Sequence, residues 1–164
     1  MRTLTIIRHA KSSWKDVELA DFDRPLNKRG KRDAPLAGQR LRDHNIALDL
    51  IITSPAKRAL TTAKVIAEEI GYSKKNLVAD RHVYMADVED LIQMLRAVDN
   101  SYKHVAIVGH NPDLTDLANE LTGEAIDNVP TCGVVHAKLD IKSWQDLDEG
   151  TAELILFDYP KKHL

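Results

Sequence analysis

The most constraining feature of this sequence is the alternation of short β-branched runs with longer segments of helical periodicity. In the longer segments, apolar residues recur every three or four positions, as in helices that bury one face. Strands that alternate with helices usually form mostly parallel sheets covered on both faces. We therefore predict a three-layer α/β/α sandwich with a mostly parallel central sheet.

The predicted elements follow one another in a regular order. Strands are expected over residues 3–7, 48–53, 77–79, 105–108, 133–139 and 152–157. Helices are expected over residues 31–43, from 54 to 70, near 87–98 and from 111 to 122. The last two strands are separated by a turn at residues 146–150, so they could form an antiparallel pair.

Proline and glycine mark the ends of two of these helices. Ser54-Pro55 and Asn111-Pro112 each have the pattern of an N-cap followed by proline at the first helical position. Gly71 and Gly123 follow the last periodic residues, where glycine commonly ends a helix.

A polar segment over residues 10–30 contains no predicted element. Its length of about 20 residues is unusual for a connection without structure, which favours a functional role. Its acidic residues could hold a cation, although a solvated loop is the preferred interpretation. Lys11, Ser13 and Arg24 could line the rim of a neighbouring pocket.

Composition limits the classes of function. A chain of 164 residues can bury a sizeable core, and we predict one domain over residues 1–164. The net charge of −2 provides no overall attraction to nucleic acid or to an anionic membrane, so neither is predicted as a partner. Cys132 is the only cysteine and is expected to be structural. A chain without a disulfide or a signal-like apolar segment is predicted to be cytoplasmic.

Candidate functional residues follow three of the predicted strands. Arg8 and His9 come directly after the first strand, Arg58 lies early in the helix after the second, and His110 follows the strand at 105–108. Ligands of open α/β sheets bind outside the carboxyl ends of the strands. If these three strands are neighbours in the sheet, the four side chains meet in one pocket.

Two arginines and two imidazoles beside helix N-termini would suit a phosphate group. One histidine, when neutral, can accept a phosphoryl group, and the other can donate hydrogen bonds to the transferring oxygens. Nearby cations would favour the unprotonated form of His9. The histidines at 44, 104, 136 and 163 are expected to be structural or solvated, and the chain shows no metal-binding spacing of histidines.

Four segments resemble the histidine phosphatase superfamily, in the small branch of bacterial phosphohistidine phosphatases of the SixA type. They are LTIIRHAK at 4–11, DRPLNKRG at 23–30, IITSPAKRALTTA at 51–63 and VAIVGHNP at 105–112. The resemblance implies a phosphoglycerate mutase-like fold and a covalent phosphohistidine on His9 that water then hydrolyses. It assigns the phosphate pocket to Arg8, Arg58 and His110, and it implies no metal or organic cofactor.

One departure from the superfamily pattern concerns the proton donor. Many members that act on esters carry an acidic donor in the region that corresponds to residues 79–87, and no glutamate stands there in this chain. Asp80, His82, Asp87 and Glu89 are possible substitutes. An alkoxide leaving group needs a proton in the transition state, whereas imidazole is only weakly basic (pKa about 6.5) and leaves readily. The absence therefore favours phosphohistidine as the substrate.

Three functions stay open at this point. The preferred one is a metal-independent phosphatase for phosphohistidine on a protein. The alternatives are a phosphatase for small phosphomonoesters and a phosphate-binding regulator without turnover, against which the presence of His9 argues. A phosphomutase is disfavoured because the acid is missing. Nucleotide binding is disfavoured because neither a GxGxxG nor a GxxxxGK[ST] motif is present.

Overall fold

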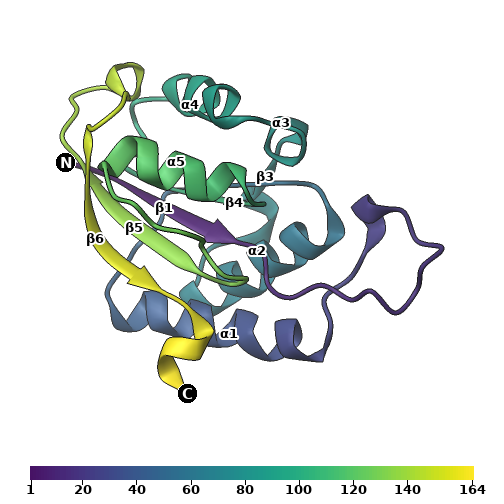
Figure 1. The fold of residues 1–164 in the computed structure, drawn as a ribbon. Coiled ribbons are helices and arrows are strands. Elements are labelled where there is room, and N and C mark those ends of the chain that lie inside the picture. Colours follow the sequence, from purple (N-terminus) through teal and green to yellow (C-terminus); the bar gives the residue numbers. More distant parts are fainter.

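The computed structural model describes residues 1–164, which form a six-stranded sheet covered by helices (Figure 1). The strands are β1 (Arg2–Arg8), β2 (Leu50–Thr53), β3 (Val78–Ala79), β4 (His104–Gly109), β5 (Val134–Leu139) and β6 (Ala152–Asp158). The helices are α1 (Lys28–Asp43), α2 (Lys57–Ile70), α3 (Arg81–Tyr84), α4 (Val88–Arg96) and α5 (Asp113–Thr122). Short 3₁₀ turns cover Asp21–Asp23, Lys74–Asn76, Trp144–Asp146 and Pro160–His163.

The strand order is β3-β2-β4-β1-β5-β6. The first four strands in this order pair in parallel, whereas β5 runs antiparallel to both β1 and β6. The predicted mostly parallel sheet and the antiparallel pairing of the last two strands are both confirmed.

Helices cover both faces of the sheet, with α1 and α2 on one side and α3, α4 and α5 on the other (Figure 1). Successive residues of a strand point to opposite faces. Ile7 and Ile51 accordingly pack with α1 and α2, whereas Ile6 and Ile52 pack with α4 and α5. Burial on both faces explains why these strands are apolar at consecutive positions, and it confirms the three-layer architecture.

The expected N-cap positions at Ser54 and Asn111 are wrong, because both helices begin later in the chain. Helix α2 follows Ala56 and α5 follows Pro112, and neither N-cap side chain accepts a capping hydrogen bond. The two side chains still accept backbone N–H groups: Ser54 Oγ accepts from Ala56 at 3.2 Å, and Asn111 Oδ1 accepts from Thr115, in the first turn of α5, at 3.2 Å. The C-terminal glycines are confirmed, because Gly71 and Gly123 adopt the left-handed backbone conformation.

Helix α1 begins three residues earlier than the sequence pattern indicates. The Asn27 side chain accepts a hydrogen bond from the Gly30 N–H at 2.9 Å and so caps the helix. Gly30 therefore lies inside the helix and does not end the preceding loop. A Cβ at this position would lie 2.2 Å from the Lys11 carbonyl oxygen, so only glycine allows the close approach of the two segments.

The segment before α1 is also more ordered than a solvated loop. It contains the 3₁₀ turn at Asp21–Asp23 and an isolated antiparallel bridge between Ser12 and Leu26. None of the helices combines the length and the apolar character needed to cross a bilayer.

Candidate active site

The structure brings the four predicted residues to one edge of the sheet. Arg8 and Gly109 are paired across β1 and β4, so His9 and His110 leave neighbouring strands at the same level. The His9 backbone N–H donates to the Gly109 carbonyl at 3.0 Å, and the two imidazole centroids lie 5.2 Å apart. Arg58 is the second residue of α2, and its charge lowers the pKa values of both histidines.

His9 is buried and held in a defined tautomer. Its Nδ1 lies 2.7 Å from the Ala10 carbonyl oxygen. Because a carbonyl only accepts, Nδ1 carries the proton, and the lone pair of neutral His9 is on Nε2. Burial above all, opposed by the Ala10 hydrogen bond and helped by the charges of Arg58 and Arg8, lowers the pKa of His9 to about 4. His9 is therefore neutral near pH 7 and presents a nucleophilic nitrogen.

His110 is placed by its contact with the strand beside it. Its Nε2 lies 2.7 Å from Oγ of Ser54, and its buried Nδ1 has no hydrogen-bond partner. Burial, followed by the neighbouring His9 and Arg58, lowers the pKa of His110 to about 3. The ring of Tyr84 meets His110 edge-on at 5.5 Å. The unpartnered nitrogen is therefore free for a ligand.

The two arginines are held by carbonyl oxygens. Nη1 of Arg8 donates to the Val129 carbonyl at 3.1 Å, and its buried Nε has no partner. Nη1 of Arg58 donates to the Asp21 carbonyl at 2.7 Å, and Nη2 donates to Oδ2 of the same residue at 3.0 Å. Both terminal nitrogens of Arg58 thus contact Asp21, and a phosphate that binds Arg58 must share it with this carboxylate.

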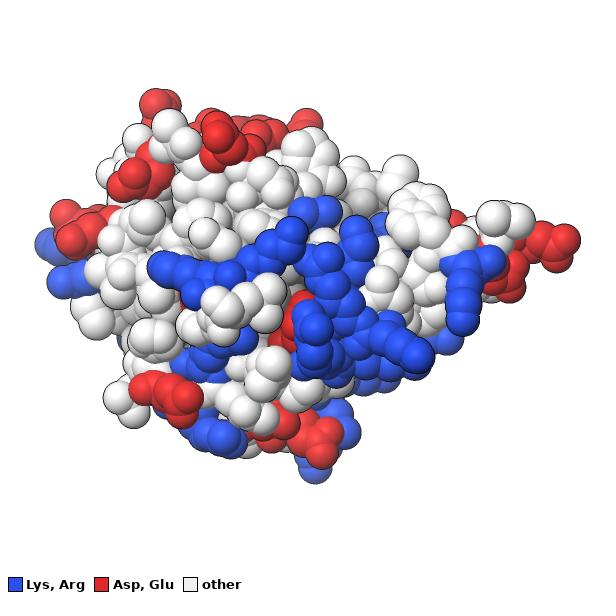
Figure 2. Space-filling view, turned by 60° about the horizontal axis from the view of Figure 1, so that its bottom comes forward, with Lys and Arg blue, Asp and Glu red and all other residues white.

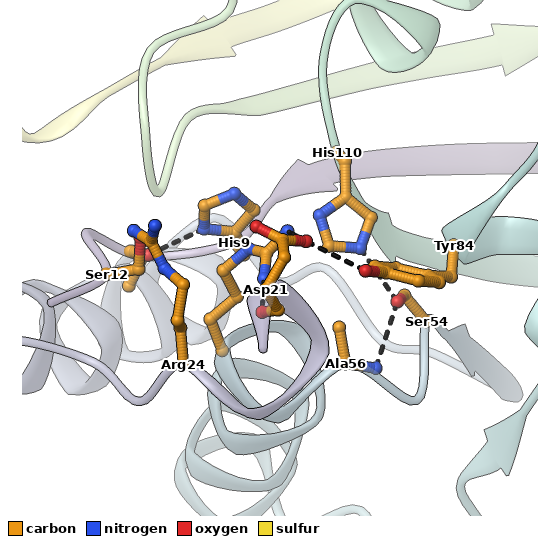
Figure 3. Close-up of polar contacts among 10 residues, drawn as sticks. His9, Ser12, Asp21, Arg24, Ser54, Ala56, Tyr84 and His110 are labelled. Atoms are coloured by element: carbon orange, nitrogen blue, oxygen red, sulfur yellow. Dashed lines mark hydrogen bonds and ion pairs between the residues drawn. The ribbon is translucent and has the colours of Figure 1, made fainter. Parts of the chain in front are cut away.

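Asp21 is the site residue that the sequence pattern did not single out. Its carboxylate accepts a hydrogen bond from the Tyr84 hydroxyl at 2.8 Å in addition to the one from Arg58. Figure 3 shows this carboxylate in front of the imidazoles of His9 and His110. Partial burial raises its pKa, but the hydrogen bonds from Tyr84 and Arg58 outweigh that effect and hold the pKa below its ordinary value. The unusual length of the segment over residues 10–30 was the only sequence signal for it.

The family model of the histidine phosphatase superfamily (branch 1) matches residues 4–83, which include His9 and Arg58. An uncharacterised protein of Mycobacterium leprae is 32% identical over 170 residues, which cover 94% of this chain and 100% of that protein. The chain belongs to the histidine phosphatase superfamily. A 2,3-bisphosphoglycerate-dependent phosphoglycerate mutase of Brucella anthropi is 33% identical over 92 residues, which cover 55% of this chain and 45% of the mutase.

Solved structures of superfamily members share the whole fold. A protein of Nakamurella multipartitia described provisionally as the phosphohistidine phosphatase SixA superposes with a TM-score of 0.83 at 28% identity and covers 97% of this chain and 96% of its own. A protein of Agrobacterium tumefaciens with the same provisional description superposes with a TM-score of 0.82 at 26% identity. The match covers 97% of this chain and 98% of that protein. These likenesses support a phosphatase with a phosphoglycerate mutase-like fold.

None of the four possible substitutes for the superfamily's acidic donor forms a hydrogen bond or ion pair with Arg8, His9, Arg58 or His110. Asp80 caps α3 and lies 2.8 Å from Nδ1 of His82, a side chain that is 79% exposed. Asp87 caps α4 in a reciprocal arrangement with Asp90. Glu89 accepts a hydrogen bond from Gln93 on the same helix. Asp21, in contrast, contacts Arg58 directly.

Cys132 is buried, and burial raises the pKa of its thiol to about 12. The thiolate that a nucleophilic cysteine needs is therefore not populated near neutral pH. The remaining strand histidines bond to neighbouring threonines, with Nδ1 of His104 at 2.9 Å from Thr3 Oγ1 and Nδ1 of His136 at 2.8 Å from Thr5 Oγ1. These groups stabilise the sheet.

Proposed function

We propose that the protein is a phosphohistidine phosphatase that acts on a phosphorylated protein through a covalent phosphohistidine on His9. The observation that carries this proposal is the state of His9, which is buried, neutral and protonated on Nδ1 by virtue of the Ala10 carbonyl. Its Nε2 is thereby available as the nucleophile in a site that also holds Arg8, Arg58 and His110.

In the first step, Nε2 of His9 attacks phosphorus while the bond from phosphorus to the substrate nitrogen breaks. Arg8, Arg58 and the unpartnered Nδ1 of His110 are the groups available to contact the transferring oxygens. The leaving imidazole nitrogen keeps the bonding electron pair and takes up a proton. The product is His9 phosphorylated on Nε2 and still protonated on Nδ1, a state in which the imidazole is ready to leave again.

In the second step, water attacks the phosphorus, and Nε2 of His9 departs with its electron pair as neutral imidazole. Inorganic phosphate is released, and the water gives up a proton. We propose Asp21 as the group that supplies the first proton and accepts the second. A dianionic phosphoryl group beside Arg58 would raise the pKa of this carboxyl, because a like charge nearby disfavours ionisation. Asp21 would then carry a proton only when substrate is bound.

The positive charge needed in the transition state comes from Arg8 and Arg58 in this proposal, so no metal or organic cofactor is required. Without substrate, hydrogen bonds from Tyr84 and Arg58 hold Asp21 ionised. A carboxyl group that is ionised before substrate binds suits an imidazole leaving group better than a strongly basic alkoxide. This consideration favours phosphohistidine over small alkyl phosphomonoesters, the second candidate substrates.

The deciding experiment is a rapid-quench burst assay with labelled phosphohistidine peptide in the presence of chelator. Basic quenching preserves phosphohistidine, so we expect label on the wild-type chain within milliseconds, followed by release of phosphate. His9→Ala should carry no label, whereas His44→Ala, an exposed histidine at the end of α1, should behave as wild type. Absence of both label and phosphate release in the wild type would contradict the proposal. Faster turnover of alkyl phosphates than of phosphohistidine would favour the small-molecule alternative.

A further inference from the structure

An open groove of about 930 Å³ lies between the segment that follows His9 and the beginning of α1. Five of its lining side chains are cations and none is a carboxylate; the cations are Lys11, Lys15, Lys28, Arg29 and Lys31. In Figure 2 the α1 side of the molecule is turned toward the viewer, and Lys and Arg side chains gather on this face. This concentration contrasts with the net charge of −2 for the whole chain.

Three of the groove's cations, Lys28, Arg29 and Lys31, lie in the first turns of α1, where positive charge is unfavourable for helix stability. Four of the first five residues of α1 are Lys or Arg, and its first turn has no acidic residue. Cations are unfavourable at a helix N-terminus, which already carries partial positive charge. The Asp33 carboxylate pairs with Nε of Arg29 at 3.7 Å and with Nε of Arg32 at 3.0 Å. Lys28 and Lys31 have no acidic partner within 4.0 Å. Local rules are most often broken in this way at functional surfaces.

The groove has a fixed position relative to His9. The Lys11 carbonyl accepts from the Asn27 N–H at 2.9 Å, and the Pro25 carbonyl accepts from the Ser13 N–H at 2.8 Å. These bonds join the two segments that line the groove, residues 11–15 and 25–31, close to His9 in the sequence. The groove therefore begins at Lys11, two residues along the chain from His9.

An aromatic side chain adds a second kind of contact. Trp14 lines the groove and is 72% exposed. The Arg24 guanidinium carbon lies 2.9 Å from the centroid of its ring. Arg24 is itself buried and donates to Ser12 Oγ at 3.1 Å, so its guanidinium packs in a fixed position against one face of the indole. Exposed tryptophan next to arginine is typical of the residues that dominate protein–protein binding energy.

We propose that this groove binds an acidic segment of the substrate protein that flanks its phosphohistidine. The inference rests on the proposed function and names the chemical character of the substrate. A phosphoryl group delivered by a protein brings neighbouring residues against the groove, whereas a small phosphate ester at His9 does not reach it. Attraction limited to one short groove suits a short acidic stretch better than a long polyanion, which the net charge of −2 would not favour.

The test uses the double variant Lys28→Glu/Lys31→Glu and three substrates: a phosphohistidine peptide with acidic flanks, one with neutral flanks, and an aryl phosphate. The matched control is Lys138→Glu/Lys142→Glu. Both control lysines are exposed, and they belong to the opposite end of the sheet, where Lys138 pairs with Thr3 and the Lys142 carbonyl accepts from Arg2. The two double variants change the net charge equally.

We expect wild type to favour the acidic peptide by about tenfold in kcat/KM, mainly through KM, and to lose this preference at high salt. The groove variant should lose the preference and keep its rate on the aryl phosphate, while the control variant retains both. Equal rates on the two peptides in wild type, or equal losses in both double variants, would overturn the inference.

A binding measurement separates this inference from the proposed function. The unphosphorylated acidic peptide should quench the fluorescence of Trp14 in wild type, and Trp14→Phe should abolish the signal, because the other tryptophan, Trp144, is buried. Binding without turnover would support the groove and contradict the phosphatase. Turnover without binding of this peptide would support the phosphatase and contradict the groove. Saturable binding of a single-stranded oligonucleotide instead of the peptide would assign the groove to nucleic acid.

Discussion

The Thr62 hydroxyl accepts a hydrogen bond from the Ala10 backbone N–H at 3.0 Å. The same hydroxyl donates to the Arg58 carbonyl at 2.7 Å, and Thr62 is fully buried. Since the Ala10 carbonyl holds Nδ1 of His9, one side chain of α2 connects the proposed nucleophile to the helix that carries Arg58. The spacing of the two groups thus depends on a residue that touches neither substrate nor phosphate.

We expect Thr62→Val to lower kcat more than KM, because the Ala10 N–H loses its partner and His9 is no longer fixed. The free energy of unfolding should fall by about 1–3 kcal/mol, the cost of leaving a buried donor unsatisfied. Thr62→Ser keeps the hydroxyl and should retain most of the activity. Steady-state kinetics and urea unfolding measure both effects. An active Thr62→Val enzyme would show that this hydroxyl does not position the nucleophile.

The His9 imidazole should titrate near pH 4, well below the ordinary value of about 6.5. Because the folded-state pKa is lowered, the unfolded chain binds more protons between these two values. This contribution to stability is complete above about pH 6.5 and is lost as the pH falls through about 4. An NMR titration of the imidazole C–H signals checks the value, with the urea-unfolded chain as the reference. A midpoint for His9 near 6.5 would contradict the neutral nucleophile.

Replacement of Asp21 by asparagine should affect substrates according to their leaving groups. A proton donor matters most when the leaving group is basic, so we expect losses of about 10²–10⁴-fold for alkyl phosphates and little change for p-nitrophenyl phosphate. The measurement is a plot of kcat/KM against the pKa of the leaving group, which should be steeper for Asp21→Asn than for wild type.

The control for this variant is Asp23→Asn, since Asp23 is exposed and belongs to the same 3₁₀ turn. An equal loss for every substrate would indicate that Asp21 only positions Arg58. A gain for every substrate would indicate that its carboxylate merely competes with phosphate for Arg58.

Removal of the α1 cations should stabilise the protein. Each charge change at a helix N-terminus contributes about 0.3–1 kcal/mol, so Lys28→Glu and Lys31→Glu should each raise the free energy of unfolding by this amount at low salt. The gain should shrink as salt screens the charges. Lys138→Glu, in strand β5, should show no such gain. Loss of stability in the α1 variants would mean that these lysines support the fold.

Local patterns in the sequence were sufficient to predict the three layers and to select four candidate site residues. Apolar periodicity depends only on which face of an element is buried, so strands and helix faces such as Leu114 and Leu117 of α5 were predicted correctly. Arg8, His9, Arg58 and His110 were found because each directly follows a recognisable buried strand or begins the helix after it. Their meeting in one pocket required neighbouring strands, and the order β2-β4-β1 meets that condition.

Tertiary structure decided what depends on partners distant in the chain. Helix α2 begins three residues after Ser54, and folding places the Ser54 hydroxyl beside His110, 56 positions away. Asp21 contacts Arg58, 37 positions away, through a segment that has no periodicity. Short polar side chains bond to whichever group the fold brings within reach, and loop residues have no repeat that reveals their direction. The pocket could therefore be expected from sequence alone, whereas its carboxylate could not, and of the neighbouring groove only Lys11 and Ser13 were expected at a rim.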